Sequence, residues 1–246
     1  MIMENNVVLK IENLTKKFGG LTAVNEVNMH LKQGEILGVI GANGAGKTTV
    51  FNMVSGSFHP TSGKIIFNGK EIQNMQPHEI CKQGIGRTYQ VVKPFGALTL
   101  RENVMVGAMM HHPNVKEAGE VADRIIDLLG ISHLANVSGK SLTLVQMKRM
   151  EIARALATEP RVLLLDEVMA GLNPSEREAI IESIRTVSKT GVSIIIIEHV
   201  IKVIMTLTDR VYCMNQGKLI SEGTPQEVMS DPKVIESYLG VNKYAT

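Results

Sequence analysis

The nine-residue stretch GANGAGKTT at positions 41–49 determines much of what this chain can fold into. It follows the apolar run 36–40 and leads into the apolar stretch at 50–54, so we expect a buried strand, a glycine-rich turn and a helix in succession. Glycines let consecutive backbone N–H groups converge on phosphate oxygens, and the start of a helix adds positive potential there. The spacing predicts a phosphate-binding P-loop. A glycine-rich turn without a ligand would explain neither Lys47 nor Thr48.

Each position of this loop has an expected role. Lys47 is predicted to reach the β- and γ-phosphates of a nucleotide, and the Thr48 hydroxyl is predicted to be a ligand of Mg²⁺. The residues predicted to contact the nucleotide are Gly41, Ala42, Asn43, Gly44, Ala45, Gly46, Lys47, Thr48 and Thr49.

A second buried strand ends in two carboxylates. The apolar run 162–165 is too continuous for a half-exposed strand, and Asp166 and Glu167 follow it. In a parallel sheet covered on both faces, functional side chains collect where the strands end. Asp166 is therefore predicted to hold Mg²⁺ through water, and Glu167 to orient or deprotonate the water that attacks the γ-phosphate. A strand that merely ends in Asp-Glu is the alternative, and the P-loop weakens it.

Two further polar residues follow predicted strands. His199 comes after the apolar strand 192–197, and its predicted position at the same sheet edge offers a contact to the γ-phosphate. Gln90 follows a strand that leads into 84–90, and its amide can reach Mg²⁺ or the attacking water. A glutamine at the surface or in packing is the alternative for Gln90.

Phe18 lies just before a turn at Gly19 and Gly20, between two stretches, 7–14 and 24–31, that partly alternate apolar and polar residues. Such alternation predicts half-buried antiparallel strands. The Phe18 ring could stack on a purine, and a packed edge aromatic is the equally open alternative.

The residues 142–146, LTLVQ, precede a helix-forming run at 147–157. The Thr143 hydroxyl and several backbone N–H groups would then lie at the start of a helix, which is a second potential anion site. The alternative is an N-capped helix with Thr143 as the cap.

The bulk properties limit the remaining classes of protein. With 246 residues, 44% hydrophobic residues and a net charge of +2, the chain is expected to be globular, and it does not have the charge of a generic nucleic-acid-binding protein. No apolar stretch approaches the roughly 18 residues that a membrane span needs. Neighbouring His111 and His112 do not share a helix face, and the two cysteines lie in no metal-binding pattern, so neither group predicts a metal site.

In order and spacing, these motifs resemble the ATP-binding cassette (ABC) proteins, the cytoplasmic ATPase subunits of membrane transporters, over nearly the whole chain. The resemblance implies ATP and Mg²⁺ as ligands. It assigns Phe18 to adenine stacking, 41–49 to the Walker A loop, Gln90 to the Q-loop, 142–146 to the signature, Asp166 and Glu167 to Walker B, 171–173 to part of the D-loop, and His199 to the switch histidine. Through the signature, Thr143, Val145 and Gln146 would contact the nucleotide held by a second protomer.

The resemblance also implies an architecture. The expected fold is an α/β P-loop NTPase core with a mostly parallel sheet, an antiparallel β subdomain and a helical signature subdomain. One nucleotide-binding domain would span 1–246, with the helical subdomain at approximately 91–159 and short helices within 224–246.

The stretches DEVMAGLNP and GTPQEVMSDPKVIESYLG look more narrowly like the larger ATPase subunit of branched-chain amino-acid importers. This likeness implies transmembrane permease subunits, a second ATPase subunit or a homodimer, and indirectly a periplasmic or extracellular solute-binding protein as partners. Nucleic acid is not an expected partner. The implied location is peripheral, on the cytoplasmic face of the cell membrane.

The signature departs from the Leu-Ser-Gly-Gly-Gln that is usual in the family, since Thr143 replaces serine while Leu144 and Val145 replace both glycines. A β-branched residue is an outlier at positive φ, so we expect helical or extended backbone at Val145. Two alternatives stay open: the ATPase of another ABC system such as a lipid exporter, and a nucleotide-gated module with little turnover. A P-loop kinase is less favoured, because Gln90, Glu167 and His199 suit activation of water.

Overall fold

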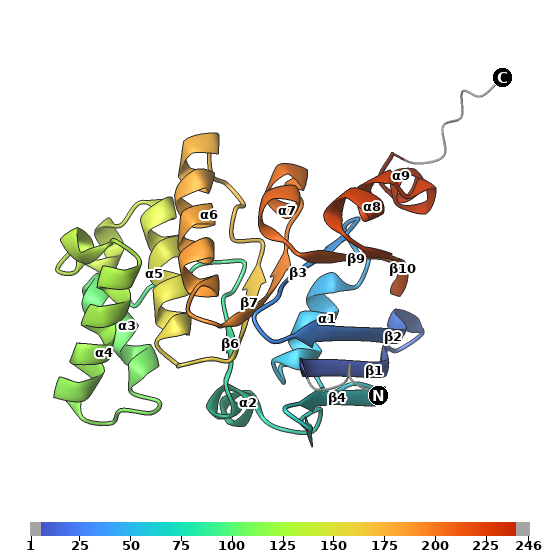
Figure 1. Ribbon diagram of the computed structural model, residues 1–246. Coiled ribbons are helices and arrows are strands. Elements are labelled where there is room, and N and C mark those ends of the chain that lie inside the picture. Colours follow the sequence, from blue (N-terminus) through green and yellow to red (C-terminus); the bar gives the residue numbers. More distant parts are fainter. Residues whose placement is uncertain (1–5, 240–246) are drawn as a thin grey trace. The chain divides into compact units, whose positions relative to one another are not determined.

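The computed structural model describes residues 6–239. They divide into two compact units, each described by itself. Unit 1 contains the described parts of 1–80 and 193–246, and unit 2 contains 81–192. The stretch 91–159, predicted as the helical subdomain, lies entirely within unit 2. Figure 1 labels the elements.

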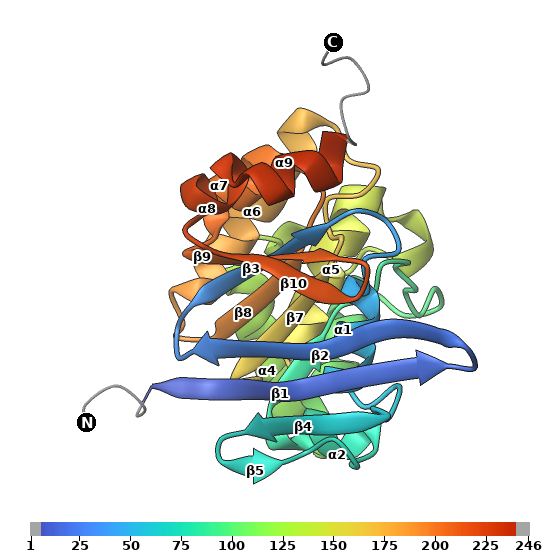
Figure 2. The ribbon, with the colours of Figure 1, turned by 90° about the vertical axis from the view of Figure 1, so that its right-hand side faces the viewer.

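Unit 1 contains an antiparallel sheet, drawn in Figure 2. Its strands, in sheet order, are β2 (Leu21–Lys32), β1 (Val7–Phe18), β4 (Ser62–Phe67) and β5 (Lys70–Glu71). The predicted turn at Gly19 and Gly20 is confirmed, with φ 55° at Gly19, and a second turn between the last two strands has φ 48° at Asn68 and 78° at Gly69. Positive φ at both central residues is what a tight type I′ hairpin requires, and the Asn-Gly pair tolerates it.

Unit 1 also contains strands in the order β10, β9, β3 and β8. The buried strand β3 (Ile36–Gly41) pairs in parallel with β8 (Ser193–Ile197) on one side and with β9 (Arg210–Asn215) on the other. Strand β10 (Lys218–Gly223) forms an antiparallel hairpin with β9. The helices of this unit are α1 (Lys47–Val54), α7 (Ile201–Leu207), α8 (Pro225–Ser230) and α9 (Pro232–Leu239). The predicted short helices thus occur, and the tail at 240–246 lies outside the described residues.

Helix α2 (Pro77–Gln83) carries the chain from unit 1 into unit 2. There β6 (Ile85–Arg87) pairs in parallel with the fully buried β7 (Val162–Asp166). The helices of unit 2 are α3 (Leu100–Ala108), α4 (Val115–Leu128), α5 (Leu144–Leu156) and α6 (Pro174–Ser188). Helix α3 packs against α4 and α5, and α5 packs against α6 (Figure 1).

A capping box marks the start of three of the helices in unit 2. Thr99, Thr143 and Asn173 each accept a hydrogen bond from the backbone of the third helical residue, whose side chain bonds back to the cap. Each capping box provides acceptors for two backbone N–H groups that have no acceptor within the helix. Across residues 6–239, the structure contains no helix long and apolar enough to cross a membrane.

Candidate functional site

The glycine-rich loop of unit 1 has a backbone that few other residues could adopt. Gly41, Gly44 and Gly46 have φ of 149°, 80° and 101°. A Cβ at Gly46 would lie 2.6 Å from the carbonyl oxygen of Ala23, and one at Gly41 would collide with the carbonyl of Met214. A Cβ at Gly44 would meet nothing within 4 Å, so the loop has one open side. The loop is thus packed against β2 and β9 at two glycines and accessible at the third.

Helix α1 begins directly after this loop. Its N-cap is Gly46, which has no side chain to cap the first turn. Helix geometry leaves the first backbone N–H groups without acceptors inside the helix, and these groups bind anions readily. Lys47 is 5% exposed, and its ammonium donates to the carbonyl oxygens of Gly41 at 2.7 Å and Ala42 at 3.0 Å. The arrangement fits a phosphate group, as the sequence predicts.

His199 belongs to the same unit and follows strand β8. Val39 of β3 pairs in parallel with Ile197 of β8, so the two strands end at the same edge. The phosphate loop follows one strand and His199 follows the other. The structure therefore places His199 at the sheet edge where the phosphate loop begins.

In unit 2, Gln90 and Glu167 are brought together. The Gln90 amide Nε2 donates to Glu167 Oε2 at 2.6 Å, although the two residues are 77 positions apart in sequence. Glu167 has φ 49°, a left-handed conformation that is uncommon for a residue other than glycine. Gln90 is exposed, and this contact distinguishes it from an ordinary surface glutamine. Both residues follow the carboxyl ends of neighbouring parallel strands.

Sequence reasoning missed Arg87. Its Nη2 donates to Asp166 Oδ2 at 3.0 Å, with the two side chains 7% and 2% exposed. Thr88 accepts a hydrogen bond from the Asp166 backbone N–H at 3.3 Å. The segment that ends in Gln90 therefore holds the Asp166 carboxylate in place. The one available signal was that an arginine at the end of a strand lies three positions before Gln90.

The predicted signature lies at the start of α5. Thr143 Oγ1 accepts from the Gln146 backbone N–H at 3.4 Å, and Gln146 Oε1 accepts from the Thr143 N–H at 2.9 Å. Thr143 is thus an N-cap, and it is also exposed. Val145 lies inside the helix, which confirms the ordinary backbone expected there. The contact with a nucleotide of a second protomer stays a prediction.

We expect Thr143→Val to lower the free energy of unfolding by about 1 kcal/mol, because an N-cap oxygen is lost at nearly constant shape. The ATPase activity that the ABC resemblance implies should fall as well. Thr143→Ser, which keeps the hydroxyl, is the matched control. Val145→Gly should change turnover only modestly, since the backbone N–H is kept. Urea unfolding and steady-state ATPase assays measure both effects. A large gain from Val145→Gly with no loss from Thr143→Val would show that the natural signature is impaired.

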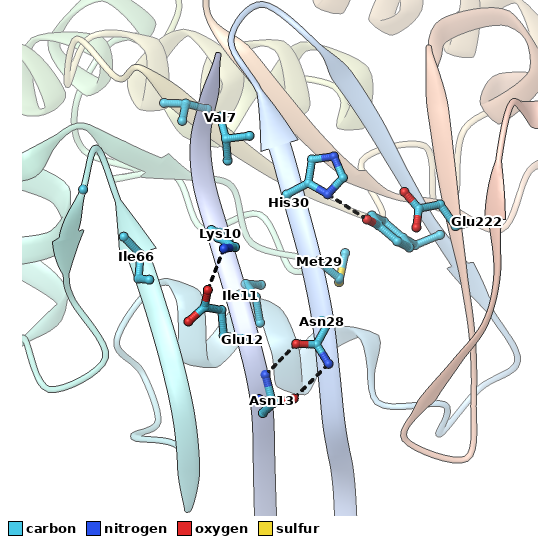
Figure 3. A pocket seen from close by; sticks show the side chains of 13 residues that line it. Val7, Lys10, Ile11, Glu12, Asn13, Asn28, Met29, His30, Ile66 and Glu222 are labelled. Carbon is cyan, nitrogen blue, oxygen red and sulfur yellow. Dashed lines mark hydrogen bonds and ion pairs between the residues drawn. The ribbon is translucent and has the colours of Figure 1, made fainter. Parts of the chain in front are cut away.

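A wide groove of about 910 Å³ in unit 1 contains none of the predicted nucleotide-binding residues (Figure 3). Its polar groups bond to one another: Lys10 pairs with Glu12 at 2.7 Å, and the Tyr212 hydroxyl lies 3.3 Å from Nδ1 of His30. Burial raises the pKa of Tyr212 to about 12, while burial and then the charge of Arg210 lower the pKa of His30. The hydroxyl therefore stays protonated and the imidazole neutral at pH 7, as a structural network requires.

The fold is that of an ATP-binding cassette. The solved ADP conformation of MJ1267, an ATP-binding cassette of an ABC transporter, matches with a TM-score of 0.87 and 32% identity, covering 95% of this chain and 99% of that one. A family model described as ABC transporter matches residues 24–170, which include the phosphate loop, Gln90, the signature and both carboxylates. The chain belongs to the ABC transporter family, whose activity is ATP hydrolysis coupled to transport. This confirms the resemblance seen in the sequence.

Two relatives indicate which kind of ABC transporter the chain is similar to. The chain is 38% identical to BraF of Pseudomonas aeruginosa, a high-affinity branched-chain amino acid transport ATP-binding protein, over 95% of this chain and 98% of that protein. It is also 38% identical to a probable branched-chain amino acid transport ATP-binding protein, LivG of Archaeoglobus fulgidus, with 95% of each chain covered. A second family model, described as branched-chain amino acid ATP-binding cassette transporter, matches residues 218–243.

Proposed function

We propose that this chain is the ATP-hydrolysing subunit of a membrane importer for branched-chain or related amino acids. The match of residues 218–243 to the branched-chain amino acid model carries the proposal. The phosphate loop and the carboxylate pair belong to ABC transporters in general, whereas this C-terminal match is specific to branched-chain amino acid transporters. The similarity to BraF over nearly the whole of both chains supports it.

The whole chain would act as one nucleotide-binding domain. Apart from Phe18, which ends the antiparallel strand β1, the candidate side chains follow the carboxyl ends of parallel strands or lie at helix starts, where ligands of α/β sheets collect. Lys47 and the backbone of 41–49 would hold the phosphates, and the Phe18 ring would stack on the base. Glu167 would orient the attacking water and take its proton, and His199 would contact the γ-phosphate.

The donor set also fits Mg²⁺. The Thr48 hydroxyl, the Gln90 amide oxygen and the Asp166 carboxylate are all oxygen ligands, which this hard cation prefers. Asp166 Oδ2 accepts from Arg87, a contact that fixes the orientation of the carboxylate. When bound, the metal would neutralise charge on the phosphates. The task of the protein is to keep these oxygens oriented.

The proposed partners are those of an importer. Two transmembrane permease subunits would hold the chain at the cytoplasmic face of the membrane, and a solute-binding protein outside would act through them. A second ATPase subunit or a second copy of this chain would close over the nucleotide with its signature. The exposure of Thr143 and Leu144 at the start of α5 supports such a contact, because a buried signature could not reach a partner.

The altered signature favours a second candidate, a nucleotide-gated module with little turnover. Leu144 and Val145 remove backbone freedom that glycines would provide. This module would bind ATP and change its association with partners without hydrolysing ATP at a useful rate. The retained N-cap hydroxyl and the helix start behind it argue for competence instead.

Reconstitution tests the proposal. The chain would be co-expressed with its proposed permease, second ATPase and solute-binding partners and incorporated into liposomes. We expect leucine or a related amino acid to stimulate ATP hydrolysis and to accumulate inside. Lysine and a phospholipid serve as control substrates. Stimulation by lipid alone would support an exporter, and ATP binding without hydrolysis in the complete assembly would favour the nucleotide-gated module.

A further inference from the structure

Two aromatic side chains of unit 1 meet at the surface rather than in the core. Phe18 ends β1 and is 43% exposed, while Phe58, in the loop between α1 and β4, is 38% exposed. Their ring centroids lie 5.5 Å apart, with the planes at 79°. Aromatic pairs favour this edge-to-face geometry. No motif in the sequence indicates this pair, because β2, β3 and α1 lie between the two residues.

The loop that carries Phe58 is fastened to the end of β1. The Lys16 ammonium donates to the carbonyl oxygen of His59 at 2.6 Å, and the Lys17 backbone N–H donates to Thr61 Oγ1 at 3.0 Å. The same ammonium lies 5.1 Å from the Phe18 ring centroid and 5.8 Å from that of Phe58. A cation over an aromatic face is attractive at these distances. Contacts between the end of β1 and the loop that carries Phe58 therefore hold the two rings together.

Both segments also connect to the phosphate loop. The Phe58 backbone N–H donates to the carbonyl oxygen of Asn52 in α1, at 3.1 Å, and α1 starts at that loop. On the other side, β2 follows the turn after Phe18, and its residues Ala23 and Val24 are the close neighbours of Gly46. The two rings are thus attached, through short stretches of chain, to the group that would hold the phosphates.

We propose that Phe58 is a positioning residue for the nucleotide base: together with Lys16, it fixes the Phe18 ring in advance so that one ring face is ready to stack on a purine. The inference rests on the proposed nucleotide binding and extends it. Ordering an exposed side chain on binding lowers affinity, and a neighbour that orders it beforehand removes this loss. Stacking does not read hydrogen-bonding groups, so adenine and guanine nucleotides should benefit alike.

The test uses the full-length protein and three ligands: ATP, GTP and inorganic tripolyphosphate. In Phe58→Leu we expect affinity for both nucleotides to fall by about threefold to tenfold, the size of effect that ordering one side chain has. Affinity for tripolyphosphate, which has no base, should be unchanged. Phe58→Tyr keeps the ring and should restore nucleotide affinity. In the ATPase assay, Phe58→Leu should raise KM for ATP without changing kcat.

Phe95→Leu is the matched control. Phe95 is 50% exposed and has its own cation over the ring, the guanidinium of Arg154 at 5.5 Å, but it belongs to unit 2. Its substitution should leave all three affinities unchanged. If Phe58→Leu left the affinity for ATP unchanged, or lowered the affinity for tripolyphosphate equally, the role of Phe58 would be overturned while the proposed function would stand. If the unaltered protein bound none of the three ligands, the proposed function would fail as well.

Discussion

In Glu167→Gln we expect ATP binding to be retained and hydrolysis to fall by about 10²-fold or more, the range in which a general base contributes. The amide has the shape of the carboxylate but cannot take a proton from the attacking water. Its oxygen can still accept from Gln90 Nε2, which donates to Glu167 Oε2 at 2.6 Å. The local structure should therefore survive, and ATP-bound closed dimer should accumulate. Single-turnover hydrolysis and size-exclusion chromatography with ATP measure the two effects.

Glu159→Gln is the control for this prediction. Glu159 is also a glutamate with left-handed backbone, at φ 51°, and it lies in the same unit, where it contacts His112. The same chemical change there should leave hydrolysis unaltered. If Glu167→Gln hydrolysed ATP at the unaltered rate, Glu167 would have no part in the mechanism, whereas loss of ATP binding would indicate a structural role.

The elements that could be predicted from sequence are those with strong local signals. Asn68-Gly69 permits only a few turn conformations, and Asn173-Pro174 supplies both a cap and a first helical residue. Helix α6 accordingly begins at Pro174, directly after its cap Asn173. The phosphate loop is equally local, because its glycines, lysine and threonine lie within nine residues. At these positions the residues nearby in sequence are enough to determine the local conformation that the structure has.

Helix α7 shows where local signals fail. The segment Ile201–Leu207, IKVIMTL, is rich in β-branched residues, which favour strands. The structure is nevertheless helical, with Val203, Ile204 and Leu207 buried on one side. Spacing of three and four residues between apolar side chains suits a helix face. Tertiary packing therefore decides the conformation, as it does for most short helices.

The parts of the candidate site that sequence reasoning missed depend on contacts between distant positions. Arg87 pairs with Asp166 across 79 positions, and Phe58 meets Phe18 across 40. Neither Arg87 nor Phe58 belongs to a sequence motif that would identify it. Their roles follow from strand register in one case and from loop attachment in the other. Motif spacing identifies the residues that would touch the nucleotide, whereas the residues that orient them require a structure.

In Lys47→Ala we expect affinity for ATP to fall by about 10-fold to 100-fold, because a hydrogen bond between charged groups contributes about 1.5–3 kcal/mol. The Lys47 ammonium is buried and donates to the carbonyl oxygens of Gly41 and Ala42. It is thus held beside the helix start where phosphates would bind. Alanine removes the only charge that this loop brings to the phosphates. Turnover should fall with it, because the same cation stabilises charge that develops on the γ-phosphate.

Titration with ATP and with inorganic tripolyphosphate measures this loss and locates it. Lys47→Ala should weaken both ligands, since both carry the phosphates, whereas Phe58→Leu should weaken only the nucleotide. Lys64→Ala is the control: Lys64 is an exposed lysine of unit 1 that pairs with Glu71 on the antiparallel sheet, and its removal should change neither affinity. Unchanged ATP affinity and turnover in Lys47→Ala would remove the loop at 41–49 from phosphate binding. A loss for ATP without a loss for tripolyphosphate would place Lys47 at the base end of the nucleotide, against the geometry of the loop.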